Sequence, residues 1–155
     1  MGEIVVREAE VGDLDALLGL YRELMAGDRP SAQPGEETGS RPVLETMLAD
    51  PARHLLVATI NDEVLGTVDL LIAANLTHRH EPWAIVENVV VATRARRSGV
   101  GRALMEHAFG LARTAGCYKV QLLSGMHRGP AHNFYCELGM EPMAQGFKIY
   151  LDGTS

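Results

Sequence analysis

The residues with the clearest chemical potential form a short segment rich in arginine and glycine in the second half of the chain. Residues 96–101 have the sequence RRSGVG, and they join an apolar run that ends at Val91 to a long amphipathic run that begins at Val100. A helix N-terminus presents unpaired backbone N–H groups and a positive partial charge, and glycines let an anion approach that backbone. The segment therefore predicts a phosphate-binding loop at the start of a helix.

Two other kinds of phosphate-binding loop begin in a similar way, and the sequence fits neither. A dinucleotide-binding fingerprint needs a third glycine and an acidic residue at the end of a second strand, and both are absent. A P-loop needs a Gly-Lys-Ser/Thr ending, which does not follow. A plain basic surface is the remaining alternative for the four arginines of this region, Arg94, Arg96, Arg97 and Arg102.

Metal and disulfide chemistry are not expected. His78 and His80 are two residues apart, so one strand face supplies two metal ligands at most, and solvated loop histidines are the commoner explanation. Cys117 and Cys136 lack a CxxC spacing and lie inside apolar patterns. This arrangement predicts reduced, packed thiols.

Acidic and basic residues are distributed unevenly along the chain. Residues 1–63 contain 13 Asp and Glu against 5 Lys and Arg, whereas residues 64–155 contain 7 against 9. The acidic first half argues against a nucleic-acid partner, because phosphates require a basic surface, and it suits a cationic acceptor such as an amine. Solubility alone is the other explanation of this acidic half.

Length and hydrophobicity predict one compact domain over residues 1–155. The chain has 155 residues, 46% of them hydrophobic, and a chain of this size can bury a core of its own. No apolar run approaches about 18 residues, and the N-terminal sequence MGEIVVRE lacks the basic and apolar parts of a secretory signal. We therefore expect a cytoplasmic protein without a membrane partner.

Hydrophobic periodicity predicts alternating strands and helices around these residues, without internal repeats. The expected strands are 4–6, 54–60, 64–74, 84–91, 119–123 and 147–151. The expected helices run from an N-cap at Asp13 to about Gly27, and over 42–48, 99–115 and 131–138. Residues 27–40, rich in glycine, proline and polar residues, predict a mobile loop, and residues 61–63 predict a hairpin turn.

Three motifs in this order resemble the GNAT superfamily of acyl-CoA-dependent N-acetyltransferases, and the resemblance covers nearly the whole chain. RRSGVG at 96–101 matches the family's Gln/Arg-x-x-Gly-x-Gly/Ala signature between a strand and a helix. VENVVV at 86–91 is similar to the family's fourth strand, and AHNFYCELGM at 131–140 is similar to its A-x-x-F-Y-x-x-L-G-F segment. Met140 stands where the family usually has an aromatic residue.

The resemblance implies an α/β fold with a mixed, mostly antiparallel sheet of six to seven strands, flanked by about four helices. It implies acetyl-CoA as acyl donor, with no metal, bound between strands 4 and 5. The pyrophosphate would lie on the loop at 96–101, and the pantetheine arm would pair with exposed backbone of the splayed fourth strand. The residues implied to bind the donor are Val89, Val91, Arg96, Arg97, Ser98, Gly99, Gly101, Arg102 and Arg128.

The implied reaction is direct attack of an amine on the thioester through a tetrahedral intermediate. An alkylammonium, whose usual pKa is about 10.4, must first lose a proton, and by resemblance Glu87 is the candidate base, acting directly or through water. The backbone N–H of Val89 would stabilise the oxyanion, and Tyr135 matches the family's general acid for the departing thiolate. A surface glutamate and a packing tyrosine are the alternatives for the two side chains.

The acceptor and the partners are less defined than the donor. Many family members have an asparagine where this chain has Arg128, which could contact a coenzyme A phosphate or ribose or could be a solvated loop residue. The loop 27–40 is expected to form one wall of the acceptor cleft, together with Tyr21, His78, His80 and Trp83. We expect a small-molecule primary amine as acceptor. The alternatives are a protein lysine or N-terminus and a non-catalytic acyl-CoA-binding regulatory module, and a homodimer is implied by the family alone.

Overall fold

The structure is a computed structural model that describes residues 2–26, 28 and 33–153, in two units. The first unit ends at Leu122, and the second begins at Leu123. Between residues 2 and 153, none of the described helices is long and apolar enough to cross a membrane.

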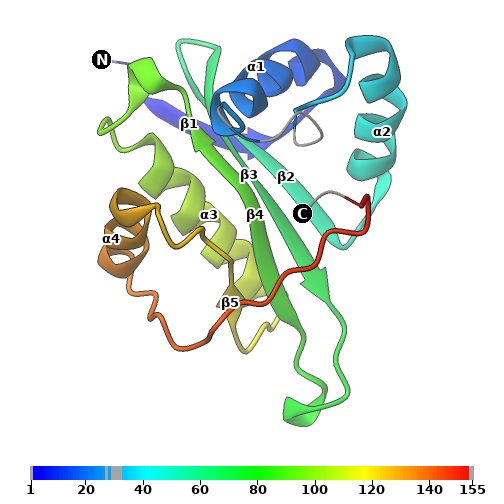
Figure 1. Ribbon diagram of the computed structural model, residues 1–155, viewed down its shortest axis with the longest axis vertical. Helices are drawn as coiled ribbons and strands as arrows, with labels where there is room; N and C mark the ends of the chain where they lie inside the picture. Colours follow the sequence, from blue (N-terminus) through cyan, green and yellow to red (C-terminus); the bar gives the residue numbers. More distant parts are fainter. Residues whose placement is uncertain (1, 27, 29–32, 154–155) are drawn as a thin grey trace. The chain divides into compact units, whose positions relative to one another are not determined.

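A mixed sheet forms the centre of the first unit (Figure 1), and its strands follow the order β1-β2-β3-β4-β5. The strands are β1 (Ile4–Glu8), β2 (Arg53–Ile60), β3 (Glu63–Ala73), β4 (Trp83–Val91) and β5 (Val120–Gln121). Strands β1 to β4 pair in antiparallel fashion, whereas β5 runs parallel to β4. Asn61 and Asp62 both have positive φ, of 50° and 64°, and they make the predicted tight turn between β2 and β3. The predicted mixed, mostly antiparallel sheet is confirmed.

Helices cover both faces of this sheet. They are α1 (Leu14–Leu24), α2 (Glu37–Ala49) and α3 (Val100–Thr114), with short 3-10 turns η1 (Val11–Asp13), η3 (His78–His80) and η4 (Thr93–Ala95). Val57 belongs to the apolar cluster formed with α1 and α2, and it pairs with Thr67. Gly66, the neighbour of Thr67, approaches α3 so closely that an added Cβ would lie 2.9 Å from Val100 Cγ1. Because neighbouring strand residues point to opposite faces, α1 and α2 lie on one face and α3 on the other.

The second unit contains the helix α4 (Gly129–Glu137) but no strand at 147–151, where one was predicted. Phe147, Ile149 and Leu151 do alternate as in a strand, yet their side chains are exposed. A strand needs a neighbour that takes up its backbone hydrogen bonds, and no neighbour pairs with this segment among the described residues. The expected six to seven strands are therefore corrected to five in the described part of the chain.

Four smaller predictions also need correction. Helix α2 begins at Glu37, so the end of the predicted loop 27–40 is helical, while residues 27 and 29–32 lie outside the described residues. Strand β5 has two residues rather than the five of 119–123. Cys117 is half-buried, and burial raises the pKa of its thiol, whereas Cys136 is exposed rather than packed; both are free.

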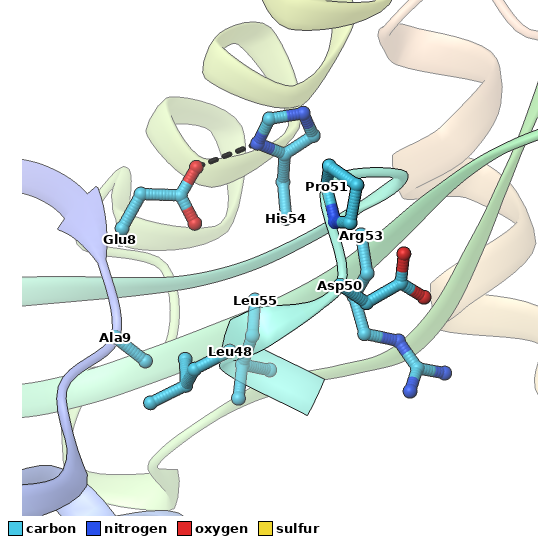
Figure 2. Close-up of a pocket in the computed structure, with 8 residues that line it drawn as sticks. All are labelled: Glu8, Ala9, Leu48, Asp50, Pro51, Arg53, His54 and Leu55. Carbon is cyan, nitrogen blue, oxygen red and sulfur yellow. Dashed lines mark hydrogen bonds and ion pairs between the residues drawn. The ribbon is translucent and has the colours of Figure 1, made fainter. Parts of the chain in front are cut away.

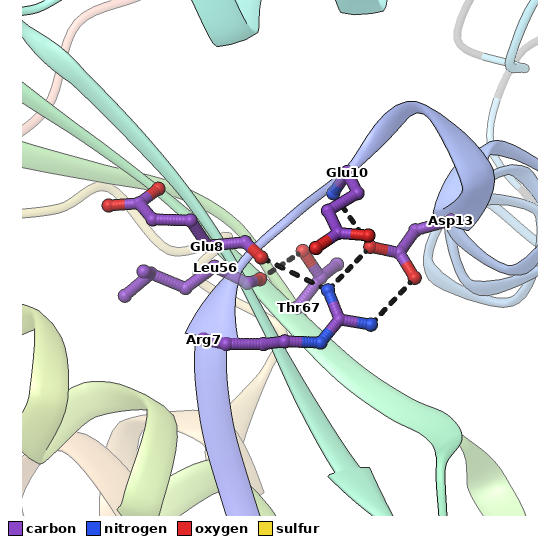
Figure 3. Close-up of polar contacts among 6 residues, drawn as sticks. All are labelled: Arg7, Glu8, Glu10, Asp13, Leu56 and Thr67. Atoms are coloured by element: carbon purple, nitrogen blue, oxygen red, sulfur yellow. Dashed lines mark hydrogen bonds and ion pairs between the residues drawn. The ribbon is translucent and has the colours of Figure 1, made fainter.

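The fourth correction concerns Asp13, which precedes α1 as predicted but does not cap that helix. Its two carboxylate oxygens instead accept hydrogen bonds from the Arg7 guanidinium, at 2.8 and 2.9 Å, as Figure 3 shows. The backbone N–H of Glu10 donates a further bond to Asp13 Oδ2 at 2.8 Å. The carboxylate therefore ties β1 to the turn that leads into α1.

Candidate active site

The segment rich in arginine and glycine folds as a tight connection between β4 and α3. Arg97 has a φ of 61°, and Gly99, the N-cap of α3, has a φ of 90°. A side chain disfavours the left-handed conformation, which explains the glycine at residue 99. The Ser98 hydroxyl donates a hydrogen bond to the carbonyl of Ala95. This strand, loop and helix are the arrangement that the anion-binding prediction requires.

The arginines around this loop differ in their partners. Arg94 is paired with Glu63, and Arg102 Nη1 lies 3.5 Å from Glu106 Oε1. Arg96 and Arg97 are exposed and make no ion pair within the described part of the chain. Both guanidinium groups are therefore accessible to an anion near the start of α3.

Helix α1 anchors the turn that precedes the loop. Glu23 Oε2 accepts hydrogen bonds from the Thr93 backbone N–H, at 2.8 Å, and from the Thr93 hydroxyl, at 2.9 Å. These bonds hold the pKa of Glu23 below its usual value. Because the two residues are 70 positions apart, no local pattern in the sequence predicts this contact.

Strand β4 contains a bulge directly after Glu87. Two of its residues, Asn88 and Val89, lie opposite the single residue Val68 of β3. Asn88 has a φ of 51°, and the extra residue interrupts the regular ladder, as in other β-bulges. The Glu87 side chain beside it is exposed. The bulge therefore begins directly after the candidate base, which stays paired with Asp69, and it includes the backbone of Val89.

Strands β4 and β5 separate soon after they meet. Ala84 pairs with Val120 and Ile85 with Gln121, and no further pair joins the two strands in the first unit's described residues. Strand β4 continues to Val91, so among the residues that the structure describes its edge from residue 86 onward has no strand partner on the β5 side. An open strand edge can pair with an extended ligand through backbone hydrogen bonds. Val89 and Val91 lie on this open stretch.

A buried polar group that was not predicted from the sequence lies next to Glu87 on the α1 and α2 face of the sheet. Asp69 is 2% exposed and pairs directly with Glu87 across β3 and β4. Asp69 Oδ1 lies 3.2 Å from Arg53 Nε, although neither atom makes an aligned hydrogen bond. Burial raises the pKa of Asp69, in opposition to the charge of Arg53. Burial and the Asp69 charge raise the pKa of Tyr21 to about 12.

One signal for this group was present in the sequence. Asp69 is the only charged residue of the apolar run at 64–74, and a buried acid normally needs a partner. Arg53 follows the previous helix, and only the register of β2 on β3 brings the two together. The acid could therefore have been noted from the sequence, but its partner could not.

The residues expected around the acceptor divide between two places. Tyr21 is largely buried and lies close enough to Asp69 for the charge of that carboxylate to act on its hydroxyl. His78 stacks on Tyr118 with ring centroids 3.9 Å apart, and Trp83 lies 5.9 Å from Lys119 Nζ, close to the β3–β4 connection. Within the described ranges, no three His, Cys, Asp or Glu side chains form a group that could hold a metal ion.

Tyr135 and Arg128 belong to the second unit. Tyr135 is half-buried in α4, and its ring centroid lies 5.3 Å from that of Phe134. Arg128 immediately precedes α4, and its backbone N–H donates to the carbonyl of Gly125 at 3.0 Å. The roles of these two residues toward a donor bound at the first unit stay predictions.

A separate pocket of about 270 Å³ lies near the N-terminal end of β2 (Figure 2). In it, His54 Nδ1 lies 2.6 Å from Glu8 Oε1. Its lining residues are Glu8, Ala9, Leu48, Asp50, Pro51, Arg53, His54 and Leu55. None of the predicted site residues lines this pocket, which shares Arg53 and Asp50 with the charged groups around Asp69.

The chain is similar to known acetyltransferases over most of its length. The model of the acetyltransferase (GNAT) family matches residues 18–140. The aminoalkylphosphonate N-acetyltransferase of Salmonella typhimurium (strain LT2) is 28% identical over 135 residues, which cover 86% of this chain and 82% of that protein.

Solved structures share the same arrangement of elements. An acetyltransferase candidate from Agrobacterium tumefaciens strain C58 has a TM-score of 0.86 and 38% identity, over 94% of this chain and 99% of its own. A protein described as a transcriptional regulator from Bacillus halodurans C-125 has a TM-score of 0.85 and 25% identity, over 96% of this chain and 100% of its own. The fold is thus shared along nearly the whole chain.

Proposed function

This chain belongs to the acetyltransferase (GNAT) family, and on that premise we propose that it transfers an acetyl group from acetyl-CoA to the primary amine of a small molecule. The resemblance predicted from the three motifs is confirmed at the level of the family. The observation that carries the proposal is the open edge of β4 with Glu87 at its bulge, followed by the loop rich in arginine and glycine at the start of α3.

The donor site would be built from this loop and this edge. Arg96 and Arg97 would neutralise the pyrophosphate of acetyl-CoA, and Gly99 and Gly101 would give it access to backbone N–H groups at the start of α3. The backbone of β4 around Val89 and Val91 would pair with the pantetheine arm. The exposed Arg96 and Arg97 and the short pairing of β4 with β5 support this assignment. Ser98, Arg102 and Arg128 complete the predicted donor-binding set.

The proposed chemistry needs one base and one acid. Glu87 would accept a proton from the acceptor ammonium, directly or through water, and the freed nitrogen would attack the thioester carbonyl. The oxyanion would accept a hydrogen bond from the Val89 backbone N–H. Collapse of the intermediate would break the carbon–sulfur bond, and Tyr135 would give its hydroxyl proton to the departing thiolate. The attacking nitrogen would release its second proton as the amide forms, and that proton would restore the Tyr135 hydroxyl.

The charge near Glu87 favours a cationic acceptor. Glu87 is an exposed carboxylate, Asp69 lies directly opposite it on the neighbouring strand with Arg53 offsetting part of its charge, and the first half of the chain is acidic. An ammonium group would therefore gain favourable electrostatic energy here. The Salmonella relative acts on aminoalkylphosphonates. Short aminoalkylphosphonates are therefore the first acceptors to test, followed by other small primary amines.

The test begins with calorimetric titration of the protein with acetyl-CoA, followed by a thiol-release assay over aminoalkylphosphonates, other small amines and lysine peptides. We expect saturable binding, and thiol release with a small amine. Absence of coenzyme A binding would overturn the proposal. Binding without release from any amine would indicate a non-catalytic acyl-CoA-binding module, and release with peptides alone would indicate a protein acetyltransferase.

Glu87→Gln tests the base within the same assay. We expect kcat/KM for the amine to fall about 100-fold or more near neutral pH, the usual contribution of general base catalysis, while the affinity for acetyl-CoA is unchanged. Glu45→Gln, on the exposed face of α2, is the matched control and should behave as the wild type. Unchanged kcat/KM in Glu87→Gln would return Glu87 to the role of a surface glutamate.

A further inference from the structure

The Arg53–Asp69 ion pair lies beside the candidate base and is not used by the proposed chemistry. Asp69 pairs directly with Glu87 of β4 on one side and with Leu55 of β2 on the other. Arg53 is two residues before Leu55, so it shares the face of Asp69 and Glu87. The Arg53 side chain is 25% exposed, whereas that of Asp69 is 3% exposed. The pair is therefore largely buried, and the exposed Glu87 is its neighbour.

Charged and titratable groups face Asp69 from each neighbouring element. Arg53 comes from β2, Glu87 from β4, Tyr21 from α1, and Asp50 from the turn between α2 and β2. Arg53 is the single cation of this set. Because Arg53 and Asp69 carry opposite charges beside Glu87, removing either charge changes the electrostatic field at Glu87.

We propose that the Arg53–Asp69 ion pair is a positioning pair that sets the electrostatic field at Glu87, and thereby the pH range of acetyl transfer and the preference for a cationic acceptor. This inference rests on the proposed function, because the pair acts through Glu87. If the ion pair were purely structural, removing either partner would destabilise the protein, and both variants would change activity in the same direction. If the pair sets the electrostatic field at Glu87, removing Asp69 and removing Arg53 should change the pH dependence and the amine KM in opposite directions.

The charge that each variant leaves behind predicts the direction in which the acid side of the pH profile and the amine KM change. Asp69→Asn leaves Arg53 uncompensated, which favours the deprotonated form of Glu87 and repels an ammonium. The acid limb of kcat/KM should therefore move to lower pH, and the KM for the amine should rise. Arg53→Gln leaves Asp69 uncompensated, so the acid limb should move to higher pH and the KM for a cationic amine should fall. At an intermediate effective dielectric constant we expect each shift to be about 0.5 pH units or more.

The experiment measures kcat/KM against pH and the amine KM at saturating acetyl-CoA for both variants. Arg53→Lys keeps the cation and should retain the wild-type acid limb. Glu8→Gln removes a carboxylate from the exposed Glu8–His54 pair at the end of β1, and as the matched control it should leave the limb in place. Thermal unfolding confirms that each variant is folded. Shifts in the same direction, or no shift in folded variants, would overturn the inference.

Two further comparisons keep the result decisive. If Asp69→Asn does not fold, the contrast between Arg53→Gln and Arg53→Lys still carries the test, and equal acid limbs in those two would overturn the inference. Glu87→Gln separates this inference from the proposed function. An acid limb that persists in Glu87→Gln refutes Glu87 as the base, whereas a limb lost in Glu87→Gln but unmoved by the pair variants refutes only the role of the pair.

Discussion

Three carboxylates of the first unit differ in proton affinity because their surroundings differ. Hydrogen bonds from Arg7 lower the pKa of Asp13, and hydrogen bonds from Thr93 lower that of Glu23. Burial raises the pKa of Asp69. Desolvation and hydrogen bonding thus have opposite effects on chemically similar groups, and the residue type alone does not reveal which effect dominates.

Tyr135→Phe tests the proposed acid at the scale of one hydroxyl. We expect kcat to fall about 100-fold or more while the KM for acetyl-CoA changes much less, because a general acid acts mainly in the transition state. Steady-state kinetics at saturating amine measure both constants. Tyr118→Phe removes a hydroxyl from the residue that stacks on His78 and should have wild-type kinetics. An unchanged kcat in Tyr135→Phe would leave Tyr135 as a packing partner of Phe134.

The candidate site was predictable from the sequence where its residues are close together along the chain. Residues 96–101 carry the loop, its glycines and its arginines in one motif, and Glu87 precedes them in a single strand. The Glu23–Thr93 and Arg53–Asp69 contacts join distant segments. Neither contact has a local signature, because each arises from strand register or helix packing rather than from periodicity.

At the scale of elements, the accuracy of a prediction depended on where the backbone hydrogen bonds of the element are formed. A helix forms its own backbone hydrogen bonds, whereas a strand needs a neighbouring strand to form them. Helix α3 pairs its own backbone groups, so periodicity and the flanking glycines predicted its bounds to within one residue. Strand β5 and the segment 147–151 depend on neighbours for their hydrogen bonds. Strand β5 pairs with β4 over two residues only, and segment 147–151 pairs with no described strand, so alternation of apolar residues overestimated both.

Gly101→Val tests the donor loop at the start of α3. We expect a folded protein whose affinity for acetyl-CoA falls at least 10-fold, because a β-branched side chain would obstruct the approach of phosphate to the backbone. Calorimetric titration measures the affinity, and circular dichroism and thermal unfolding report the fold.

Gly110→Ala is the control for a glycine change in the same helix. No atom lies within 4 Å of an added Cβ at Gly110, so this variant should bind acetyl-CoA as the wild type does. It should also gain about 0.5–1 kcal/mol of stability, the usual difference between Gly and Ala inside a helix. Wild-type affinity in a folded Gly101→Val protein would refute the phosphate-binding role of this backbone.

At the scale of the whole molecule, stability in acid depends on those carboxylates whose pKa differs between the folded and the unfolded chain. The Arg7–Asp13 contact joins the first strand to the turn before α1 (Figure 3). The pKa of Asp13 is lower in the folded protein than its usual value. Its stabilising contribution is therefore complete above the unfolded pKa and disappears as the pH falls through the folded pKa.

Asp13→Asn should reduce the free energy of unfolding by about 1 kcal/mol at neutral pH, a value discounted because Arg7 is partly exposed. The difference between the wild type and this variant should persist down to about pH 4 and then shrink as the wild-type carboxylate becomes protonated. Urea unfolding at a series of pH values measures that difference. Asp15→Asn changes an exposed carboxylate in the first turn of α1 and should show little of the effect. A difference that is constant across the acid range would mean that shape, rather than charge, explains the loss in Asp13→Asn.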